Sequence, residues 1–299
     1  MTQTPKRRFS PEGLTLSPAM EDYLKAIFTL GREGNAVSTQ AVAKRLQFAP
    51  ASVTKMIKRL AEYKLVSYEK YQGVHLTESG RKVAVEILRH HRLLELYLTQ
   101  ALGFSWDEVH EEAERLEHFI SEKLEAKICD YLGNPDFDPH GAPIPTLDGD
   151  IPKQNTLTLL EAELYHPHQI TRVSDAESQE LQTLQEEGIF PGITVTVLGR
   201  PPQGSIHLRV GREEKLVNPE ICRGVLCKPS NFECFTLPQL TLGESASIIK
   251  IRSHHRTALT KLGLCQNTRV TKTEQGFLGP NGLFSIDKTK ASSIILQAN

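Results

Sequence analysis

The fold of the first part of this chain is decided by residues 50–77, which read PASVTKMIKRLAEYKLVSYEKYQGVHLT. The spacing of Val53, Ile57 and Leu60 predicts a helix with one apolar face and one polar, basic face. Two short apolar runs follow, separated by the turn Tyr71-Gln72-Gly73, and they predict a β-hairpin. A helix that leads directly into a hairpin is typical of one half of a small DNA-binding fold.

The residues before this stretch supply the other half. Ser17-Pro18 is a good helix start, and an apolar face continues to Leu30. Ser38 then caps a second short helix, and a tight break at 47–50 leads into the third. Helix, helix–turn–helix and hairpin together predict a winged helix–turn–helix domain, whose third helix would enter the DNA major groove.

Charge supports a polyanionic partner for this domain. Residues 1–80 hold 12 Lys and Arg against 7 Asp and Glu, whereas residues 81–150 hold 7 against 15. A basic segment attracts duplex DNA, and an acidic one attracts cations. The polar face of the third helix and the hairpin tip provide candidate DNA contacts. They are Ser52, Thr54, Lys55, Lys58, Arg59 and Lys70.

A long helix is expected over residues 77–101, followed by a second over about 107–124. Both have apolar faces beyond a complete DNA-binding unit, which suggests a homodimer interface, since duplex readers usually bind symmetric half-sites. The second helix would gather four polar side chains into an arc of roughly 80–100°. They are His110, Glu114, Glu117 and His118.

Imidazoles and carboxylates beside a buried face are typical of a divalent-metal site. A solvated, charged helix face is the plainer interpretation, but a further His/Glu pair, His91 and Glu95, lies at i, i+4 upstream. Residues 110–114 differ by one letter from the zinc-hydrolase pattern H-E-x-x-H, with Glu114 in place of the second histidine. A metal-dependent hydrolase is therefore a remote alternative, and no enzyme activity is expected.

A proline- and glycine-rich stretch, residues 133–152, marks a boundary. Beyond it one module occurs twice, each copy a short helix followed by alternating strands, which predicts two small β-barrels. The fold class is therefore α+β and multidomain. The expected domains are residues 1–79 (DNA binding), 80–152 (dimerisation and metal), 153–229 and 230–299 (the two modules).

Five cysteines without a C-x-x-C pair argue against a disulfide framework and against a thiolate zinc site. The chain has no apolar run long enough to span a membrane, and its first residues lack the apolar core of a signal peptide. A cytoplasmic protein without a membrane partner is expected.

The chain resembles the diphtheria-toxin-repressor family of metal-dependent regulators, and is most similar to its manganese transport regulators. The resemblance is strong over about residues 17–150, and residues 141–149, Gly-Ala-Pro-Ile-Pro-Thr-Leu-Asp-Gly, are its most specific part. The C-terminal copies resemble the SH3-like domain of small ferrous-transport accessory proteins. The other matching motifs are Met20–Leu24, Ser52–Met56, Tyr68–Tyr71, Leu76-Thr77, His91–Glu95 and Glu117-His118.

The resemblance implies a regulatory metal site made of Asp22, Glu114, Glu117 and His118. Iron-type members carry Met and Cys where this chain has Asp22 and Glu114, and hard oxygen ligands favour Mn²⁺, with Fe²⁺ as the alternative. Where the manganese regulators often have a further Glu, the chain has Lys25, which argues against a binuclear site.

The resemblance also implies a second, ancillary site. It would use His91, Glu95 and His110, completed by Glu177 and Glu180 from the first C-terminal module. Asp138 and His140 in the proline-rich stretch are the alternative completion.

On the DNA-binding side, the family's base-reading region matches Ala49, Ala51, Ser52, Thr54 and Lys55, and Thr39 is a further candidate contact. The function implied is a homodimeric, Mn²⁺-responsive transcriptional regulator that binds an operator in double-stranded DNA. The resemblance favours a repressor of metal-uptake genes.

Overall fold

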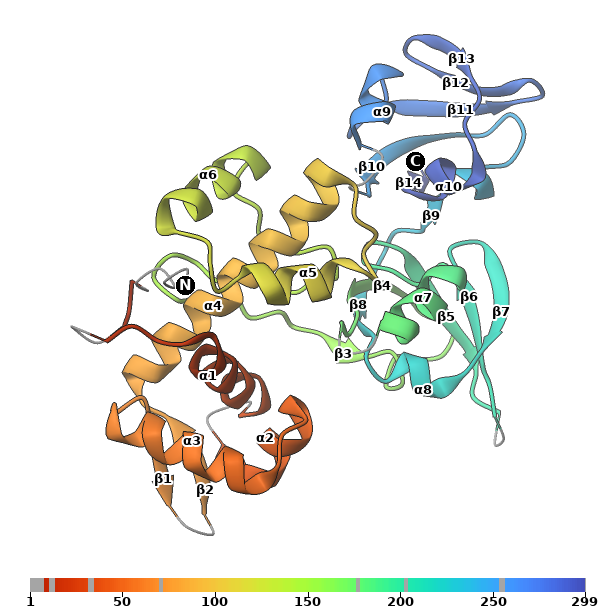
Figure 1. The fold of residues 1–299 in the computed structure, drawn as a ribbon. Helices are drawn as coiled ribbons and strands as arrows, with labels where there is room; N and C mark the ends of the chain where they lie inside the picture. The colour runs from red at the N-terminus through yellow and green to blue at the C-terminus, as the bar shows by residue number, and fades with distance from the viewer. Residues whose placement is uncertain are drawn as a thin grey trace. The chain divides into compact units, whose positions relative to one another are not determined.

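A computed structural model describes residues 8–10, 14–31, 35–69, 72–175, 178–201, 204–252 and 256–298 of the chain (Figure 1). The protein is α+β and multidomain. Its residues form two compact units, each of which takes part of the middle of the chain. The first contains Met1–Leu94, Glu111–Asp136 and Pro143–Pro152, and the second contains Glu95–His110, Phe137–Ala142 and Lys153–Asn299. The division into four domains at residues 79, 152 and 229 remains a prediction.

The first unit begins with the winged helix–turn–helix. Helices α1 (Pro18–Leu30), α2 (Thr39–Leu46) and α3 (Pro50–Glu62) precede the antiparallel hairpin of β1 (Val66–Glu69) and β2 (Gly73–Leu76). The hydroxyls of Ser17 and Ser38 accept the backbone N–H groups of Met20 and Ala41, as expected for helix N-caps. The apolar faces predicted from spacing meet in one core that includes Leu24, Val53, Ile57 and Leu60.

Helix α4 (Glu78–Tyr97) follows the hairpin and passes into one π-helical turn, Leu98–Leu102, which ends at Gly103. Gly80 lies where the start of α4 passes the hairpin. A Cβ on this glycine would come within 1.9 Å of the carbonyl oxygen of Leu65. The close approach of α4 to the hairpin therefore requires glycine at this position.

The prediction of one helix through residues 107–124 is wrong. Helix α5 (Val109–Leu116) ends at Leu116, residues 117–119 form a turn, and α6 (Glu122–Leu132) begins after the N-cap Ser121. The side chain of Ser121 accepts the N–H of Leu124 and so stabilises a separate helix start. Glu117 and His118 therefore lie in the turn, and the four polar side chains do not form one helical stripe.

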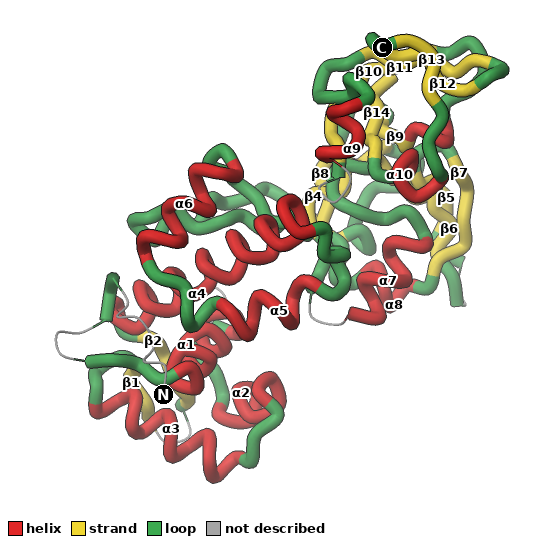
Figure 2. Tube along the Cα trace, turned by 45° about the horizontal axis from the view of Figure 1, so that its top comes forward, coloured by secondary structure: helices red, strands yellow, loops and turns green. Residues whose placement is uncertain are grey.

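Strands dominate the second unit, whereas the first is mainly helical (Figure 2). The second unit contains two six-stranded sheets. The first sheet has the strand order β3-β8-β4-β5-β6-β7, and the second sheet has the order β13-β12-β11-β10-β14-β9. Neighbouring strands within both sheets pair antiparallel. The first sheet comprises β3 (Leu157–Thr158), β4 (Pro167–Arg172), β5 (Thr194–Gly199), β6 (Ile206–Val210), β7 (Glu213–Val217) and β8 (Leu226–Pro229), with helices α7 (Ser178–Glu186) and α8 (Pro219–Cys222). The second comprises β9 (Cys234–Thr236), β10 (Ser245–Ile251), β11 (Arg269–Thr273), β12 (Gly276–Gly279), β13 (Gly282–Phe284) and β14 (Ile294–Ala298), with helices α9 (Arg256–Lys261) and α10 (Lys288–Ser292).

The two sheets are not independent of each other. Cys234 and Ile295 belong to the second sheet but pack in the core of the first, together with Trp106. The rest of the second sheet has its own core around Phe235, Ile248 and Val270. The sequence analysis predicted a helix followed by strands in each copy, but it did not predict the strands that precede α7 and α9 or this shared core. None of the helices in the described ranges is long and apolar enough to cross a membrane.

Candidate metal centre

Three side chains of the first unit offer metal-ligand atoms that all lie within 4.8 Å of one another. They are Asp22 on α1 and Glu117 and His118 in the turn after α5. The Nε2 atom of His118 is 3.1 Å from Oδ1 of Asp22 and 3.6 Å from Oε1 of Glu117. Glu117 and His118 are buried and Asp22 is half-buried. Two carboxylates and one imidazole form a donor set of oxygen and nitrogen that suits a divalent first-row ion.

Glu21 holds the imidazole in place. Its buried carboxylate accepts a hydrogen bond of 2.7 Å from Nδ1 of His118. A histidine that is bound in this way presents its other nitrogen, Nε2, to an ion. Burial lowers the pKa of His118, but hydrogen bonds to Asp22 and Glu21 and the charge of Glu117 outweigh it and raise the pKa to about 9. An ion at Nε2 would therefore have to displace a proton at neutral pH.

Lys25 contacts the same carboxylate oxygen of Glu117 that faces His118. Its ammonium group is 2.7 Å from Oε1 of Glu114 and 2.6 Å from Oε1 of Glu117. His91, on α4, is 2.6 Å from Oε2 of the same Glu117. The pKa of Glu117 is lowered, because the charges of Lys25 and His91 outweigh the effect of burial. Without a metal ion, a lysine and a histidine thus provide the positive charge that this buried carboxylate requires.

His110 is not part of this group. Its Nδ1 atom is 3.1 Å from Oε1 of Glu95, and both residues belong to the second unit. The ligand atoms of Glu95, His110 and Asp175 lie within 4.8 Å of one another. The sequence analysis did not name Asp175, although it lies two residues before Glu177. Glu177 lies outside the described residues, and Glu180, in the first turn of α7, is exposed and absent from the metal-capable groups of the described residues.

Asp138 and His140 form a second group with Glu95, and all three are buried. Oδ1 of Asp138 accepts the backbone N–H groups of His140 and Ala142 at 2.9 Å each. Gly141, between His140 and Ala142, has a φ of +85°, and a Cβ on this residue would lie 1.9 Å from the carbonyl oxygen of Thr171. The loop therefore depends on glycine to place His140.

The imidazole of His140 contacts Trp106 through one nitrogen and Glu95 through the other. Its Nε2 atom donates a hydrogen bond of 2.7 Å to the carbonyl oxygen of Trp106, and its Nδ1 atom is 3.6 Å from Oε2 of Glu95. Burial lowers the pKa of His140, but the charges of Glu95, Asp138 and Asp175 raise it to about 9. Three carboxylates around one imidazole make a region in which a divalent cation would be stabilised.

The sequence analysis did not name Glu21 or Asp175 as site residues, and it used Lys25 only as an argument against a binuclear site. Glu21 stands three residues before Leu24 on the buried face of α1, where a carboxylate needs a partner. Lys25 follows one turn later and has a partner for the same reason. The approach of Asp175 to Glu95 depends on tertiary packing, and no local pattern indicates it.

The candidate DNA contacts lie mostly on one solvent-exposed face of α3 and the turn before it. Thr54 is half-buried, and its hydroxyl donates to the carbonyl oxygen of Pro50 at 3.0 Å. Thr39, in the first turn of α2, is also half-buried, and Lys70 lies outside the described residues. The exposed candidates are Ala49, Ala51, Ser52, Lys55, Lys58 and Arg59.

Three domain models match the chain. The iron dependent repressor N-terminal DNA binding domain matches residues 15–74, and the iron dependent repressor metal binding and dimerisation domain matches residues 77–146. The FeoA domain matches residues 157–229, the part that contains the first sheet. These matches agree with the order of domains expected from the sequence.

The chain is 30% identical over 217 residues to the iron-dependent repressor IdeR of Mycobacterium tuberculosis, which covers 69% of this chain and 94% of that protein. It is 36% identical over 116 residues to the transcriptional regulator MntR of Geobacillus kaustophilus, which covers 39% of this chain and 82% of that protein. Among solved structures, a manganese-dependent transcriptional repressor in complex with manganese matches with a TM-score of 0.66 and 35% identity, covering 71% of this chain and 100% of that one. The structure of ScaR with bound Zn²⁺ matches with a TM-score of 0.61 and 32% identity, covering 71% and 99%.

Proposed function

We propose that this chain, which belongs to the iron-dependent repressor family of metal-dependent, DNA-binding transcriptional repressors, is a regulator that responds to Mn²⁺. It would act as a homodimer on the operators of metal-uptake genes. The family is not one of enzymes, so the hydrolase alternative is set aside. The observation that carries the proposal is the approach of Asp22, Glu117 and His118 to within 4.8 Å without a sulfur ligand.

The donor set fits a divalent ion. Asp22, Glu117 and His118 would hold it, with Glu114 as the fourth ligand once it leaves Lys25. Bound Mn²⁺ would supply the positive charge that Lys25 and the protonated His118 provide in its absence. Oxygen-rich sites suit Mn²⁺, whereas softer sulfur ligands suit Fe²⁺ better in comparison. Thus the residues at positions 22 and 114 support manganese.

The position of these ligands in the chain suggests how metal could control DNA binding. Asp22 is on α1 of the DNA-binding domain, whereas Glu117 and His118 are in the turn between the two helices α5 and α6. When all three hold one ion, α1 is tied to that turn, and the orientation of the winged helix is restricted. A restricted orientation would favour the state in which both recognition helices of a dimer fit successive major grooves.

We infer that α3 reads DNA through the exposed side chains Ser52 and Lys55, with Ala49 and Ala51 beside them. Lys58 and Arg59 are placed one turn further on, and would contact phosphate. Thr39, the first residue of α2, and Thr54, in the second turn of α3, are further candidates, and Lys70 remains a candidate from the sequence alone.

For the ancillary site we infer that Glu95 is the central ligand. Asp138 and His140 complete it in one arrangement, and His110 with Asp175 in another. The group of Glu95, Asp138 and His140 supports the alternative based on the proline-rich stretch, and the approach of His110 and Asp175 to Glu95 supports completion from the first C-terminal module. His91 lies one helical turn before Glu95 on α4 and remains a candidate.

A ligand exchange tests the proposed metal preference. Asp22→Met with Glu114→Cys introduces softer ligands, so it should move the preference for activation of DNA binding from Mn²⁺ toward Fe²⁺. The measurement is fluorescence anisotropy of a DNA fragment selected from the genome by the parent protein, titrated anaerobically with each ion. Glu111→Gln on the exposed face of α5 is the matched control. A parent protein that responds better to Fe²⁺ than to Mn²⁺ would instead favour an iron regulator.

A further inference from the structure

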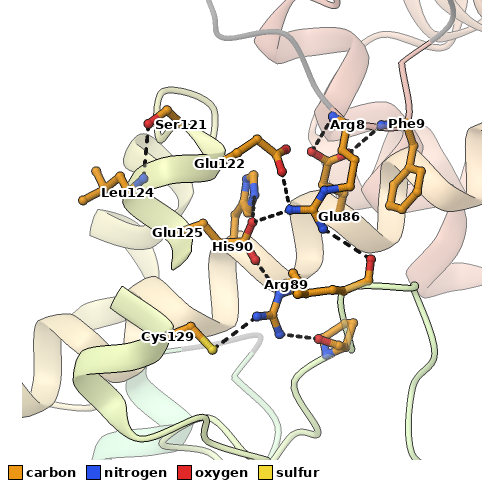
Figure 3. A network of polar contacts seen from close by, with 12 residues as sticks. Arg8, Phe9, Glu86, Arg89, His90, Ser121, Glu122, Leu124, Glu125 and Cys129 are labelled. Carbon is orange, nitrogen blue, oxygen red and sulfur yellow. Dashed lines mark hydrogen bonds and ion pairs between the residues drawn. The ribbon is translucent and has the colours of Figure 1, made fainter. Parts of the chain in front are cut away.

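A second group of metal-capable side chains lies in the first unit, away from the residues discussed above. Glu86 and His90 are one turn apart on α4, and Glu122 is at the start of α6. Their ligand atoms lie within 4.8 Å of one another. Figure 3 shows these side chains together with Arg8, whose guanidinium group lies among them.

Glu86 and His90, the two candidate ligands on α4, are buried, and the carboxyl group of Glu86 is held by backbone hydrogen bonds. Glu86 is 4% exposed and His90 is fully buried. The two carboxylate oxygens of Glu86 accept backbone N–H groups from Arg8 at 2.9 Å and from Phe9 at 3.2 Å. These backbone hydrogen bonds fix the carboxyl group, which also contacts the side chain of Glu122. One Oε atom of Glu122 is also buried and accepts no hydrogen bond among the described residues.

Three carboxyl groups lie close together here, those of Glu86, Glu122 and Glu125. The guanidinium group of Arg8 pairs with Glu122, and Glu125 is paired with Arg89 and with His90, whose Nε2 is 3.3 Å from its Oε2. Arg89 is committed to Glu125, at 2.5 Å, and to the carbonyl oxygen of Pro145. Arg8 therefore provides the mobile positive charge, and its side chain is one-third exposed.

We propose that Glu86, His90 and Glu122 form an additional site for a divalent first-row cation, for which Arg8 is the competing internal cation. Two carboxylates and one imidazole give the oxygen and nitrogen ligands that Zn²⁺ and Mn²⁺ accept. Glu122 binds either the ion or the guanidinium group of Arg8. Ion binding therefore displaces the guanidinium group of Arg8 from Glu122, and that group keeps its 3.4 Å contact with Glu125 on the same helix. The docking of residues 8–10 on α6 becomes weaker when metal is bound. The site shares no ligand with the group of Asp22, Glu117 and His118.

Ions bound per subunit can be counted by equilibrium dialysis of the full chain against Zn²⁺ and, separately, Mn²⁺. Glu122→Gln should bind about one ion fewer than the parent, because it removes a ligand charge. Glu78→Gln removes an exposed glutamate from α4, the helix that carries Glu86 and His90; it is the control and should lose none. Arg8→Gln should bind the same number, with this ion held about fivefold more tightly, the factor expected for loss of a partly exposed ion pair.

If Glu122→Gln binds as many Zn²⁺ or Mn²⁺ ions per subunit as the parent, the additional site is contradicted. If Arg8→Gln binds this ion with unchanged affinity, the competition between Arg8 and the ion is contradicted. The result is independent of the proposed function, because His118→Gln should lose a different ion. If Glu122→Gln loses an ion and His118→Gln does not, then the additional site stands and the regulatory site fails. Circular dichroism of each variant confirms that the helices are intact.

Discussion

At the level of single residues, His118 links metal, protons and stability. It donates to Glu21, lies 3.1 Å from Asp22, and is in the turn that follows α5. Sequence reasoning identified His118 and Asp22 as ligands, but it did not identify Glu21 and did not predict that Lys25 would pair with Glu117. Those two act through contacts between α1 and the α5–α6 turn, and the spacing of residues within one helix carries no information about such contacts.

The pKa of about 9 for His118 predicts how stability changes with pH in the metal-free protein. A folded-state pKa above the unfolded value of about 6.5 adds stability that is fully present below pH 6.5 and is lost as the pH rises through 9. The loss should be on the order of 3 kcal/mol. Urea unfolding at pH 6 and pH 9.5, in the presence of a chelator, measures it.

His118→Gln is the control for this prediction. Glutamine can still donate a hydrogen bond but does not titrate, so the difference in unfolding free energy between the two pH values should shrink in the variant. An equal pH dependence in the parent and the variant would show that His118 is not protonated in the folded, metal-free protein.

At the level of secondary structure, local signals predicted the winged helix–turn–helix well. Ser17 and Ser38 cap α1 and α2, and apolar spacing identified the buried face of α3. These features could be predicted because helix caps and amphipathic faces depend on residues that are close together in the sequence. The same kind of signal was overlooked at Ser121, followed by Glu122 and Glu125, which marks the start of α6. The helix expected through residues 107–124 is divided at that point.

The recognition helix α3 provides a paired prediction. Lys55→Ala should weaken binding to the specific operator by about 1–3 kcal/mol, because a lysine that reaches a base edge discriminates between sequences. Lys58→Ala should weaken binding to all duplexes alike and should make the dependence of affinity on salt less steep, as a phosphate contact does. Anisotropy titrations with specific and random DNA at several salt concentrations separate the two effects. Parent-like binding by both variants would exclude this face of α3 as the DNA-reading surface.

At the level of whole units, packing joins parts that the sequence presents as separate repeats. The two C-terminal copies share a core through Cys234 and Ile295. Arg212, at the turn between β6 and β7, makes two hydrogen bonds to Glu244 next to β10, at 2.6 and 2.7 Å. Its guanidinium group also lies 3.6 Å from the ring centre of Phe235. Strand alternation predicted the existence of each sheet, but side-chain contacts between distant segments decide how the sheets combine.

Arg212→Gln should therefore destabilise the second unit by about 2 kcal/mol, the size of a charge-assisted hydrogen bond that is largely protected from water. Arg209→Gln, which removes an exposed ion pair with Glu214 within the first sheet, is the control and should cost little. Trp106 is the single tryptophan and is buried in this unit, so its fluorescence reports unfolding. Equal midpoints for the two variants would show that Arg212 does not join the sheets.

Metal-dependent DNA binding by His118→Gln tests the proposed switch most directly. Affinity for a DNA fragment selected by the parent is measured by anisotropy with chelator and with saturating Mn²⁺, after light scattering has shown that both proteins have the same oligomeric state. The parent should gain at least about tenfold in affinity, or about 1.4 kcal/mol, on addition of Mn²⁺. His118→Gln should gain less than about twofold, because its ligand set is incomplete, whereas Glu111→Gln should respond like the parent. A parent-like gain in His118→Gln would contradict the assignment of the regulatory site to Asp22, Glu117 and His118.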